Sequence, residues 1–391
     1  MMVPVKPRMI LCTLMFAIAG IGAAPAAAQQ SDASLADKPV FLTRPATHLT
    51  TAHFVQAEFL PAHGMNLFQI KAYVPGKGVI NLLASPPLAE AKVKLDGPDP
   101  YGNEAFKIGG AFLLPYPNRI RGTLSADGKI IEADANGQKL FLPANWKGDN
   151  PGSEFHAMHG LILNARFEDV TAQDDKVKST TTAALHAGNF GGHWPSQTDV
   201  RVHAELTDNV LDLKVTATNV GTERLPMAIG MHPYFAIPSG DRTQVRVHMP
   251  AVMRAPSNNY DDVFALGVLV PVKESRFDFT ADEGAPLGTE FVDDSFTALQ
   301  RNAKGAAEVR ITDPAAKYGI KVIALSKEIR AIQMYAPPAK NFVAIEPQYN
   351  LSDPFDKKVW HRQDTGMVYL KPGQSTTWHV QFVIYELKAK I

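Results

Sequence analysis

The sequence contains almost no cysteine. Of its 391 residues only Cys12 carries a thiol, and that residue lies in an apolar stretch near the N-terminus. The chain after this position needs no disulfide in an oxidising compartment, and it has no thiol nucleophile. Cysteine-based catalysis and thiolate-rich metal centres are therefore excluded for this part of the chain.

The chain also lacks an excess of charge of either sign. Lys+Arg and Asp+Glu number 39 each, so the formal net charge is zero. No basic stripe indicates nucleic-acid binding, and no acidic run indicates a disordered tail. We therefore expect a small, neutral partner and no nucleic acid.

Sustained helical periodicity is missing as well. Apolar and polar residues instead alternate along residues 200–206 and 211–217, with the turn Thr207-Asp208-Asn209 between them, and again along residues 378–384. This period of two is typical of half-buried strands, and the 28 glycines and 29 prolines spread along the chain fit many turns. We predict an all-β fold, a large antiparallel β-sandwich that forms one domain over residues 46–391.

The first 28 residues differ from the rest of the chain. Lys6 and Arg8 precede an apolar stretch over residues 9–22, and the small residues Ala26-Ala27-Ala28 follow. This order is typical of a secretory signal peptide that is cleaved after its small residues. The alternative is an uncleaved membrane anchor, because the stretch is about long enough to span a bilayer.

We therefore expect residues 1–28 to be a signal peptide. The segment 29–45 is small and polar, and we expect it to be a flexible lead-in to the folded domain. The mature protein is then periplasmic or secreted, and it has no stable membrane association after cleavage.

His232 is the first candidate for chemistry. It follows Gly230-Met231 and precedes Pro233-Tyr234-Phe235, which places it at a strand end with aromatic cover. Apolar surroundings can desolvate an imidazole and shift its pKa, which suits a group that moves protons. The alternative is a core histidine that hydrogen-bonds a backbone carbonyl.

Glu346 is the second candidate. It directly follows the apolar strand residues Phe342-Val343-Ala344-Ile345. Burying a carboxylate there is costly unless the group is paired or hydrogen-bonded. A structural ion pair would meet that need, but close to His232 the same carboxylate is a candidate general base.

Further polar residues stand next to glycine, proline or aromatic residues. Asn118 and Arg119 follow residues 109–117, a stretch rich in glycine, proline and aromatic residues. The guanidinium of an arginine can hydrogen-bond sugar hydroxyls or hold a carboxylate. His156 and His159 have a spacing that could face a metal, although such spacing alone is weak evidence.

Two other groups carry less information by themselves. Asp293 and Asp294 form a carboxylate pair between aromatic residues. His186 and His193 bracket the glycine-rich string Asn189-Phe190-Gly191-Gly192, which we interpret as a loop without an assigned role.

Five of these motifs follow one another in the order found in a known family. They are Asn118-Arg119-Ile120, His159-Gly160, His232-Pro233-Tyr234-Phe235, Asp293-Asp294-Ser295-Phe296 and Ile345-Glu346-Pro347-Gln348. In this respect the chain resembles the aldose 1-epimerase family, the galactose mutarotases, from about Ala46 to Leu387. It departs from the family at Leu161, where the His-Gly string commonly continues with glycine.

The resemblance implies a galactose mutarotase-like supersandwich and an isomerase that interconverts the α and β anomers of an aldohexose. It implies that Glu346 is the general base and His232 the general acid. The residues that it implies for sugar binding are Asn118, Arg119, His159 and Asp293, with Asp294 as the alternative to Asp293. No cofactor and no metal is expected.

The reaction also sets expectations for the two ionisable groups. Ordinary pKa values are about 4.3 for Glu and about 6.5 for His. We predict that burial raises the pKa of Glu346 and that a nearby carboxylate keeps His232 protonated.

Three other functions remain as alternatives. One is a non-catalytic secreted carbohydrate-binding protein of the same fold. Another is a metalloenzyme in which His159, His232 and Glu346 form a two-histidine, one-carboxylate site. The third is a hexose-6-phosphate 1-epimerase, which would need a cluster of Arg or Lys for the phosphate and does not fit the export signal.

Overall fold

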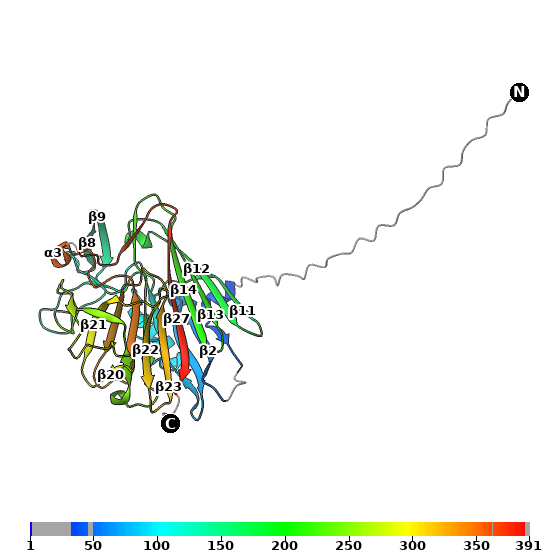
Figure 1. The fold of residues 1–391 in the computed structure, drawn as a ribbon. Coiled ribbons are helices and arrows are strands. Elements are labelled where there is room, and N and C mark those ends of the chain that lie inside the picture. Colours follow the sequence, from blue (N-terminus) through cyan, green and yellow to red (C-terminus); the bar gives the residue numbers. More distant parts are fainter. Residues whose placement is uncertain (2–32, 46–49, 362, 388–391) are drawn as a thin grey trace. The chain divides into compact units, whose positions relative to one another are not determined.

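The computed structural model describes residues 1, 33–45, 50–361 and 363–387 (Figure 1). Apart from Met1, the predicted signal peptide lies outside the described residues. The chain divides into two units, residues 1–30 and 31–391, and the fold described below is that of the second. Within the described ranges no helix is both long and apolar enough to cross a bilayer.

The largest element is an antiparallel sheet of nine strands, several of which lie side by side in Figure 1. In spatial order the strands are β11 (Glu168–Asp174), β12 (Ser179–Gly188), β13 (Thr198–Leu206), β14 (Val210–Asn219), β27 (Ser375–Glu386), β23 (Tyr318–Ala324), β22 (Ala307–Asp313), β17 (Arg246–His248) and β20 (Ala285–Pro286). The predicted hairpin is β13 and β14, with Leu206 opposite Leu211. Buried residues alternate along both strands, because one face packs on the core.

A second antiparallel sheet has seven strands. Its spatial order is β19 (Val270–Pro271), β18 (Ala251–Ala255), β21 (Val292–Leu299), β24 (Ala331–Ala336), β25 (Phe342–Gln348), β16 (Gly230–Ala236) and β5 (Gly110–Leu113). Its central strands β16 and β25 are buried almost throughout. One face packs on the nine-stranded sheet, and on the other face His232, Tyr234 and Glu346 are buried as well, so alternation is lost in these strands.

Contacts between large side chains join the two sheets. Phe235 of β16 packs against Phe382 of β27 with ring centroids 5.2 Å apart. Phe112 of β5 meets Trp378 of β27 edge-on at 6.0 Å. The predicted all-β antiparallel sandwich is therefore confirmed.

Smaller sheets and short helices complete the second unit. The sheets are β1 (Val40–Thr43), β2 (His53–Leu60), β3 (Asn66–Val74) with β4 (Gly78–Asn81); β7 (Thr123–Leu124), β8 (Ile130–Ala135) with β9 (Gln138–Pro143); β6 (Arg119–Ile120) with β10 (Ala157–Met158); and β15 (Leu225–Met227) with β26 (Val368–Leu370). The helices are α1 (Leu88–Leu95), α2 (Asn103–Phe106) and α3 (Lys357–Trp360), with the 3-10 turns η1 (Ala33–Asp37), η2 (Pro61–His63), η3 (Phe190–Gly192) and η4 (Arg242–Gln244).

Two elements correct the sequence-based expectations. The segment 29–45 is not a flexible lead-in throughout, because β1 pairs with β2 and buries Val40 and Leu42. The helix α1 has eight residues, of which Ala91 alone is buried. The helix is shorter than the window of about 11 residues over which a helical periodicity can be recognised in a sequence.

Candidate active site

His232 and Glu346 lie on the neighbouring strands β16 and β25. The register pairs Gly230 with Gln348 and Tyr234 with Ala344, which sets His232 across from Glu346. The imidazole Nε2 is 3.3 Å from the carboxyl Oε1. The two residues are 5% and 1% exposed, so the pair is almost completely removed from solvent.

The same sheet face carries further polar side chains. Gln333 of β24 lies opposite Glu346, and Asp293 of β21 lies opposite Tyr335 of β24. Because residues directly opposite one another, and residues two apart in a strand, share a face, the register brings these side chains together.

Asn118 directly precedes β6, Arg119 is the first residue of β6, and His159 directly follows the partner strand β10. The His159 N–H donates to the Asn118 carbonyl oxygen at 2.8 Å, which joins the two segments. Asn118 and His159 both have φ of +63°, a left-handed conformation that is uncommon outside glycine. Such backbone persists where the surrounding structure enforces it, often at functional sites.

Gly160 allows the His159 loop to approach the β5–β6 connection. Its φ is +84°, and a Cβ at this position would lie 2.3 Å from the Leu114 carbonyl oxygen. Leu161, which replaces the family's glycine, donates its N–H to the same carbonyl oxygen at 2.8 Å. The departure at this position is therefore compatible with the loop.

A cavity of about 540 Å³ opens over this face of the sheet. All six sequence-predicted site residues line it: Asn118, Arg119, His159, His232, Asp293 and Glu346. The structure thus brings together residues that lie far apart in the sequence.

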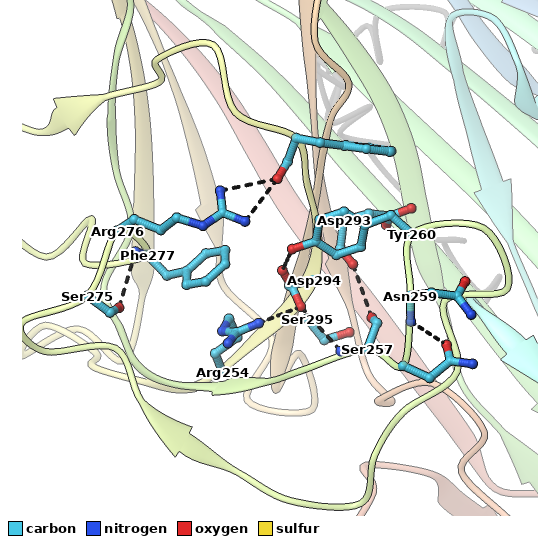
Figure 2. Close-up of polar contacts among 12 residues, drawn as sticks. Arg254, Ser257, Asn259, Tyr260, Ser275, Arg276, Phe277, Asp293, Asp294 and Ser295 are labelled. Carbon is cyan, nitrogen blue, oxygen red and sulfur yellow. Dashed lines mark hydrogen bonds and ion pairs between the residues drawn. The ribbon is translucent and has the colours of Figure 1, made fainter.

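The structure separates the two adjacent aspartates. Asp293 lines the cavity and accepts a hydrogen bond from Gln333 Nε2 at 2.6 Å. Asp294 is fully buried, and its carboxylate binds Arg254 Nη1 at 2.8 Å and the Tyr260 hydroxyl at 2.5 Å (Figure 2). Of the pair, Asp293 is therefore the one whose carboxylate faces the cavity.

Gln333 is a site residue that sequence reasoning missed. Its Oε1 accepts from Asn118 Nδ2 at 3.2 Å and from Ser295 Oγ at 2.5 Å, while its Nε2 donates to Asp293. It therefore connects Asn118 to Asp293 across the cavity floor. The available signal was a single amide between Ile332 and Met334 in a buried strand.

Burial dominates the electrostatics of the acid–base pair. It raises the pKa of Glu346 well above its ordinary value, and the charge of Asp293 adds to this effect while Arg119 opposes it. The predicted direction for Glu346 is confirmed.

The prediction that a nearby carboxylate keeps His232 protonated is wrong. Burial, with a smaller contribution from the charge of Arg119, lowers the pKa of His232 to about 3. Glu346 does lie beside the imidazole, but burial also raises the pKa of this carboxyl and so disfavours the negative charge that would hold a proton on His232. Burial therefore favours the neutral form of both groups, which corresponds to one mobile proton for the pair.

Several buried polar atoms at the cavity have no hydrogen-bond partner. They are Arg119 Nε, His159 Nδ1, His232 Nδ1 and Glu346 Oε2. An unsatisfied buried polar atom costs about 1–3 kcal/mol. These atoms are therefore available to pair with the donors and acceptors of a ligand.

Aromatic rings line the cavity beside these polar groups. Tyr234 stacks on His232 with ring centroids 4.5 Å apart, and Phe106 lies 4.8 Å from His159. Phe106 in turn meets Trp146 at 5.5 Å. Polar groups set among aromatic surfaces are typical of small-molecule sites.

The remaining histidine candidates lie elsewhere. His156 is buried, with its Nδ1 3.0 Å from the Glu154 carbonyl oxygen. His186 is exposed and lies 2.9 Å from Asp199 Oδ1, beside a separate concavity that His193 also lines. Within the described residues, no three His, Cys, Asp or Glu side chains are placed to hold a metal ion.

Known proteins are similar to this chain in sequence and in fold. The model of the family described as aldose 1-epimerase matches residues 87–383. The protein YphB of Escherichia coli K12 is 24% identical over 272 residues, which cover 68% of this chain and 80% of YphB.

The fold is similar to solved structures at low sequence identity. A galactose mutarotase-like protein of Clostridium acetobutylicum has a TM-score of 0.67 at 18% identity, with 86% of this chain and 95% of that chain covered. The GalM/aldose epimerase homologue of C. elegans has a TM-score of 0.65 at 16% identity, with 90% and 100% covered. Galactose 1-epimerase of Lactobacillus acidophilus has a TM-score of 0.60 at 14% identity, with 90% and 99% covered.

Proposed function

Since the chain belongs to the aldose 1-epimerase family, we propose that it interconverts the α and β anomers of an aldohexose. The observation that carries the proposal is the His232–Glu346 pair, two proton-transfer groups 3.3 Å apart in a polar cavity. Anomer exchange opens the sugar ring to an aldehyde, rotates the C1–C2 bond and closes the ring from the other face. Opening removes a proton from O1 and gives one to O5.

One proton on the pair satisfies both transfers. When the base takes the O1 proton, the C1–O5 bond breaks and the acid gives its proton to O5, so the pair again holds one proton. In the assignment that the family resemblance implies, Glu346 is the base and His232 the acid. The proton that burial favours on Glu346 then crosses the 3.3 Å to His232 before the ring opens.

The unpartnered atoms around the pair support a sugar as the ligand. Arg119 Nε can donate a hydrogen bond, and so can the ring N–H group of a neutral His159 or His232. Glu346 Oε2 can accept one. Sugar hydroxyls both donate and accept, so one ring can satisfy this mixed set of groups. Asn118 and Asp293, joined through Gln333, supply further partners in the cavity.

Polarimetry on the purified protein tests the proposal. Freshly dissolved α-D-glucose and α-D-galactose should reach anomeric equilibrium much faster with the protein than in buffer alone. A panel of other aldoses gives the preferred substrate. If the protein binds a sugar but leaves every spontaneous rate unchanged, it is a carbohydrate-binding protein of this fold.

Three lysines that line the cavity favour a second candidate substrate, a hexose 6-phosphate. They are Lys107, Lys147 and Lys340. Two already have partners, since Lys107 Nζ lies 2.6 Å from Glu104 Oε1 and Lys147 Nζ lies 5.3 Å from the Phe155 ring centroid. The same assay with glucose 6-phosphate distinguishes the candidates, because a phosphate-selective enzyme would leave free hexoses at their spontaneous rate.

We propose that the protein acts outside the cytoplasm after removal of residues 1–28. The sequence pattern of this segment supports the proposal. N-terminal sequencing of the mature protein from a secreting host should give Gln29 as the first residue. Recovery of the intact chain from the cytoplasmic fraction would contradict it.

A further inference from the structure

Tyr260 lies at the edge of the cavity, on the loop between β18 and β19. It lines the cavity together with Phe291, and the two ring centroids are 4.8 Å apart. Phe291 meets Tyr335 at 5.9 Å, and Tyr335 meets His232 at 6.4 Å. These rings form one continuous aromatic wall, with Tyr260 at the end away from the acid–base pair.

A buried carboxylate fixes the position of Tyr260. The tyrosine hydroxyl donates to Asp294 Oδ2 at 2.5 Å (Figure 2). Asp294 also accepts from Arg254 Nη1 at 2.8 Å, and the Arg254 guanidinium stacks 3.8 Å from the centroid of the Phe277 ring. A fully buried carboxylate is costly without such partners, so the Asp294 cluster holds the hydroxyl in one place.

The residue after Tyr260 ties the loop to a second segment at the cavity, which includes the lining residue Asp149. Asp261 accepts from the Asp149 and Asn150 backbone N–H groups at 2.8 and 3.0 Å, and from Ser153 Oγ at 2.5 Å. A Cβ on Gly148 would lie 2.1 Å from Asp261 Oδ2, so this contact requires glycine there. Tyr260 is thus anchored from two sides.

We propose that Tyr260 is a specificity-determining residue whose ring packs on the C–H face of the sugar, away from the reacting C1–O5 bond. Asp294 is then a positioning residue that acts through the Tyr260 hydroxyl. Both statements deepen the proposed function and rest on it. The polar groups of the cavity engage the hydroxyls, whereas a sugar's C–H groups need an apolar surface, which a rigid ring supplies with little loss of entropy.

The position of the ring predicts which sugars it distinguishes. The ring atoms farthest from C1 and O5 are C4 and C3. In galactose the hydrogens on C3, C4 and C5 share one face, whereas in glucose the C4 hydrogen is on the other face. An aromatic ring at this end therefore favours galactose over glucose.

The test measures kcat and KM for galactose and glucose by polarimetry in the parent and in Tyr260→Ala, Tyr260→Leu and Tyr260→Phe. For Tyr260→Ala we expect KM for galactose to rise about threefold to tenfold, the effect of one aromatic contact. We expect kcat to change less than about twofold, because proton transfer between acid and base is untouched. The galactose preference should fall in the same variant.

The other variants separate the ring from its anchor. Tyr260→Leu keeps apolar volume without an aromatic face and should behave like Tyr260→Ala. Tyr260→Phe keeps the ring but loses the Asp294 hydrogen bond, so its KM should lie between those of the parent and Tyr260→Ala. Tyr369→Ala is the matched control, since Tyr369 is half-buried on β26, stacks on Arg224 and is not among the cavity-lining residues.

Each outcome decides a separate statement. Parent-like KM and sugar preference in both Tyr260→Ala and Tyr260→Leu would overturn the role of the ring, with mutarotation itself intact. Parent-like KM in Tyr260→Phe alone would overturn the positioning role of Asp294. If the parent accelerates no sugar, the proposed function fails, and calorimetric affinities of the same variants for galactose then decide the role of Tyr260.

Discussion

The indole of Trp378 donates its Nε1–H to the Pro347 carbonyl oxygen at 2.9 Å. Trp378 belongs to β27 of the nine-stranded sheet, and Pro347 directly follows Glu346 in β25. The hydrogen bond therefore fixes the strand that carries Glu346 to the opposite sheet. An acid–base pair on paired, buried strands is held more rigidly than one on loops, which suits proton transfer over a short distance.

Replacing Glu346 by Gln should abolish most of the activity without unfolding the protein. The amide has the shape of the protonated carboxyl that burial favours, but it cannot release a proton. We expect anomer equilibration to slow by about a hundred- to ten-thousand-fold, the usual contribution of acid–base catalysis. Polarimetry measures the rate, and circular dichroism checks the fold.

Glu58→Gln is the matched control for that variant. Glu58 is also a buried glutamate with a raised pKa, but it lies on β2 of the four-stranded sheet. Its replacement should leave the rate at the parent level. Parent-like activity in Glu346→Gln would remove this residue from the mechanism.

Asp293 should give the apparent KM a pH dependence near pH 6. Burial raises its pKa to about 6, so the carboxylate that accepts from Gln333 is present above this pH and is lost below it. If Asp293 binds a sugar hydroxyl, KM should rise as the pH falls from 7 to 5. In Asp293→Asn, KM should be high and constant over this range.

This comparison also tests the protonation state of His232. An ordinary histidine titrates at about pH 6.5, close to Asp293. Because burial lowers the pKa of His232 to about 3, the imidazole should contribute nothing between pH 5 and 7. If KM of Asp293→Asn still depends on pH in the same way as that of the parent, a group other than Asp293 titrates between pH 5 and 7.

Asp353 should make the stability of the protein fall as the pH rises. Its N–H donates to the Arg119 carbonyl oxygen at 2.8 Å, and its Oδ1 accepts from the Arg121 N–H at 3.0 Å. Burial raises its pKa from 3.8 to about 7, so the folded state binds the proton more tightly than the unfolded state does. The protonated Asp353 therefore makes its full contribution to the free energy of unfolding below about pH 4, and this contribution is lost as the pH rises through 7.

Replacing Asp353 by Asn should remove this dependence. The amide is neutral, can still accept from Arg121 N–H, and tolerates the φ of +53° at this position. At pH 8 we expect the variant to be more stable than the parent by on the order of 3 kcal/mol, and at pH 4 to be similar. Thermal melts at both pH values measure the difference, and equal gains at both would contradict the ionisation argument.

Gly160→Ala should disturb both stability and substrate binding. The added Cβ would lie 2.3 Å from the Leu114 carbonyl oxygen at a φ of +84°, so the loop next to His159 must move. We expect a loss of more than about 1 kcal/mol in the free energy of unfolding, together with a raised KM. Gly240→Ala is the control, because Gly240 has φ of +72° but no atom within 4 Å of the added Cβ. If Gly160→Ala and Gly240→Ala lose the same stability and both keep the KM of the parent, the added Cβ at position 160 does not clash with the Leu114 carbonyl oxygen.

The sequence predicted more of the site than of its electrostatics. His232 and Glu346 stood out because each is an ionisable residue in an apolar strand, and all six predicted site residues do line one cavity. The protonation of His232 was predicted wrongly, since a pKa depends on the depth of burial and on the charge of groups that are near in space but far apart in the sequence, such as Arg119. Neither quantity can be obtained from the residues next to His232.

Gln333 and Tyr260 were missed for a related reason. A glutamine in a buried strand, or a tyrosine in a polar loop, has no distinctive local pattern. Gln333 matters because the sheet register sets it opposite Glu346, and Tyr260 because Asp294 binds its hydroxyl. Both relationships join segments that are far apart along the chain.

The sequence by itself determined the all-β architecture, because alternation with a period of two and frequent turn residues leave no other way to bury the apolar side chains. The tertiary structure decided which of two adjacent aspartates faces the cavity. Asp293 and Asp294 point to opposite faces of β21, and the pairing with β24 sets which face is which. It also decided that β1 joins a sheet and that the pKa of His232 is lowered, because both depend on contacts that only folding creates.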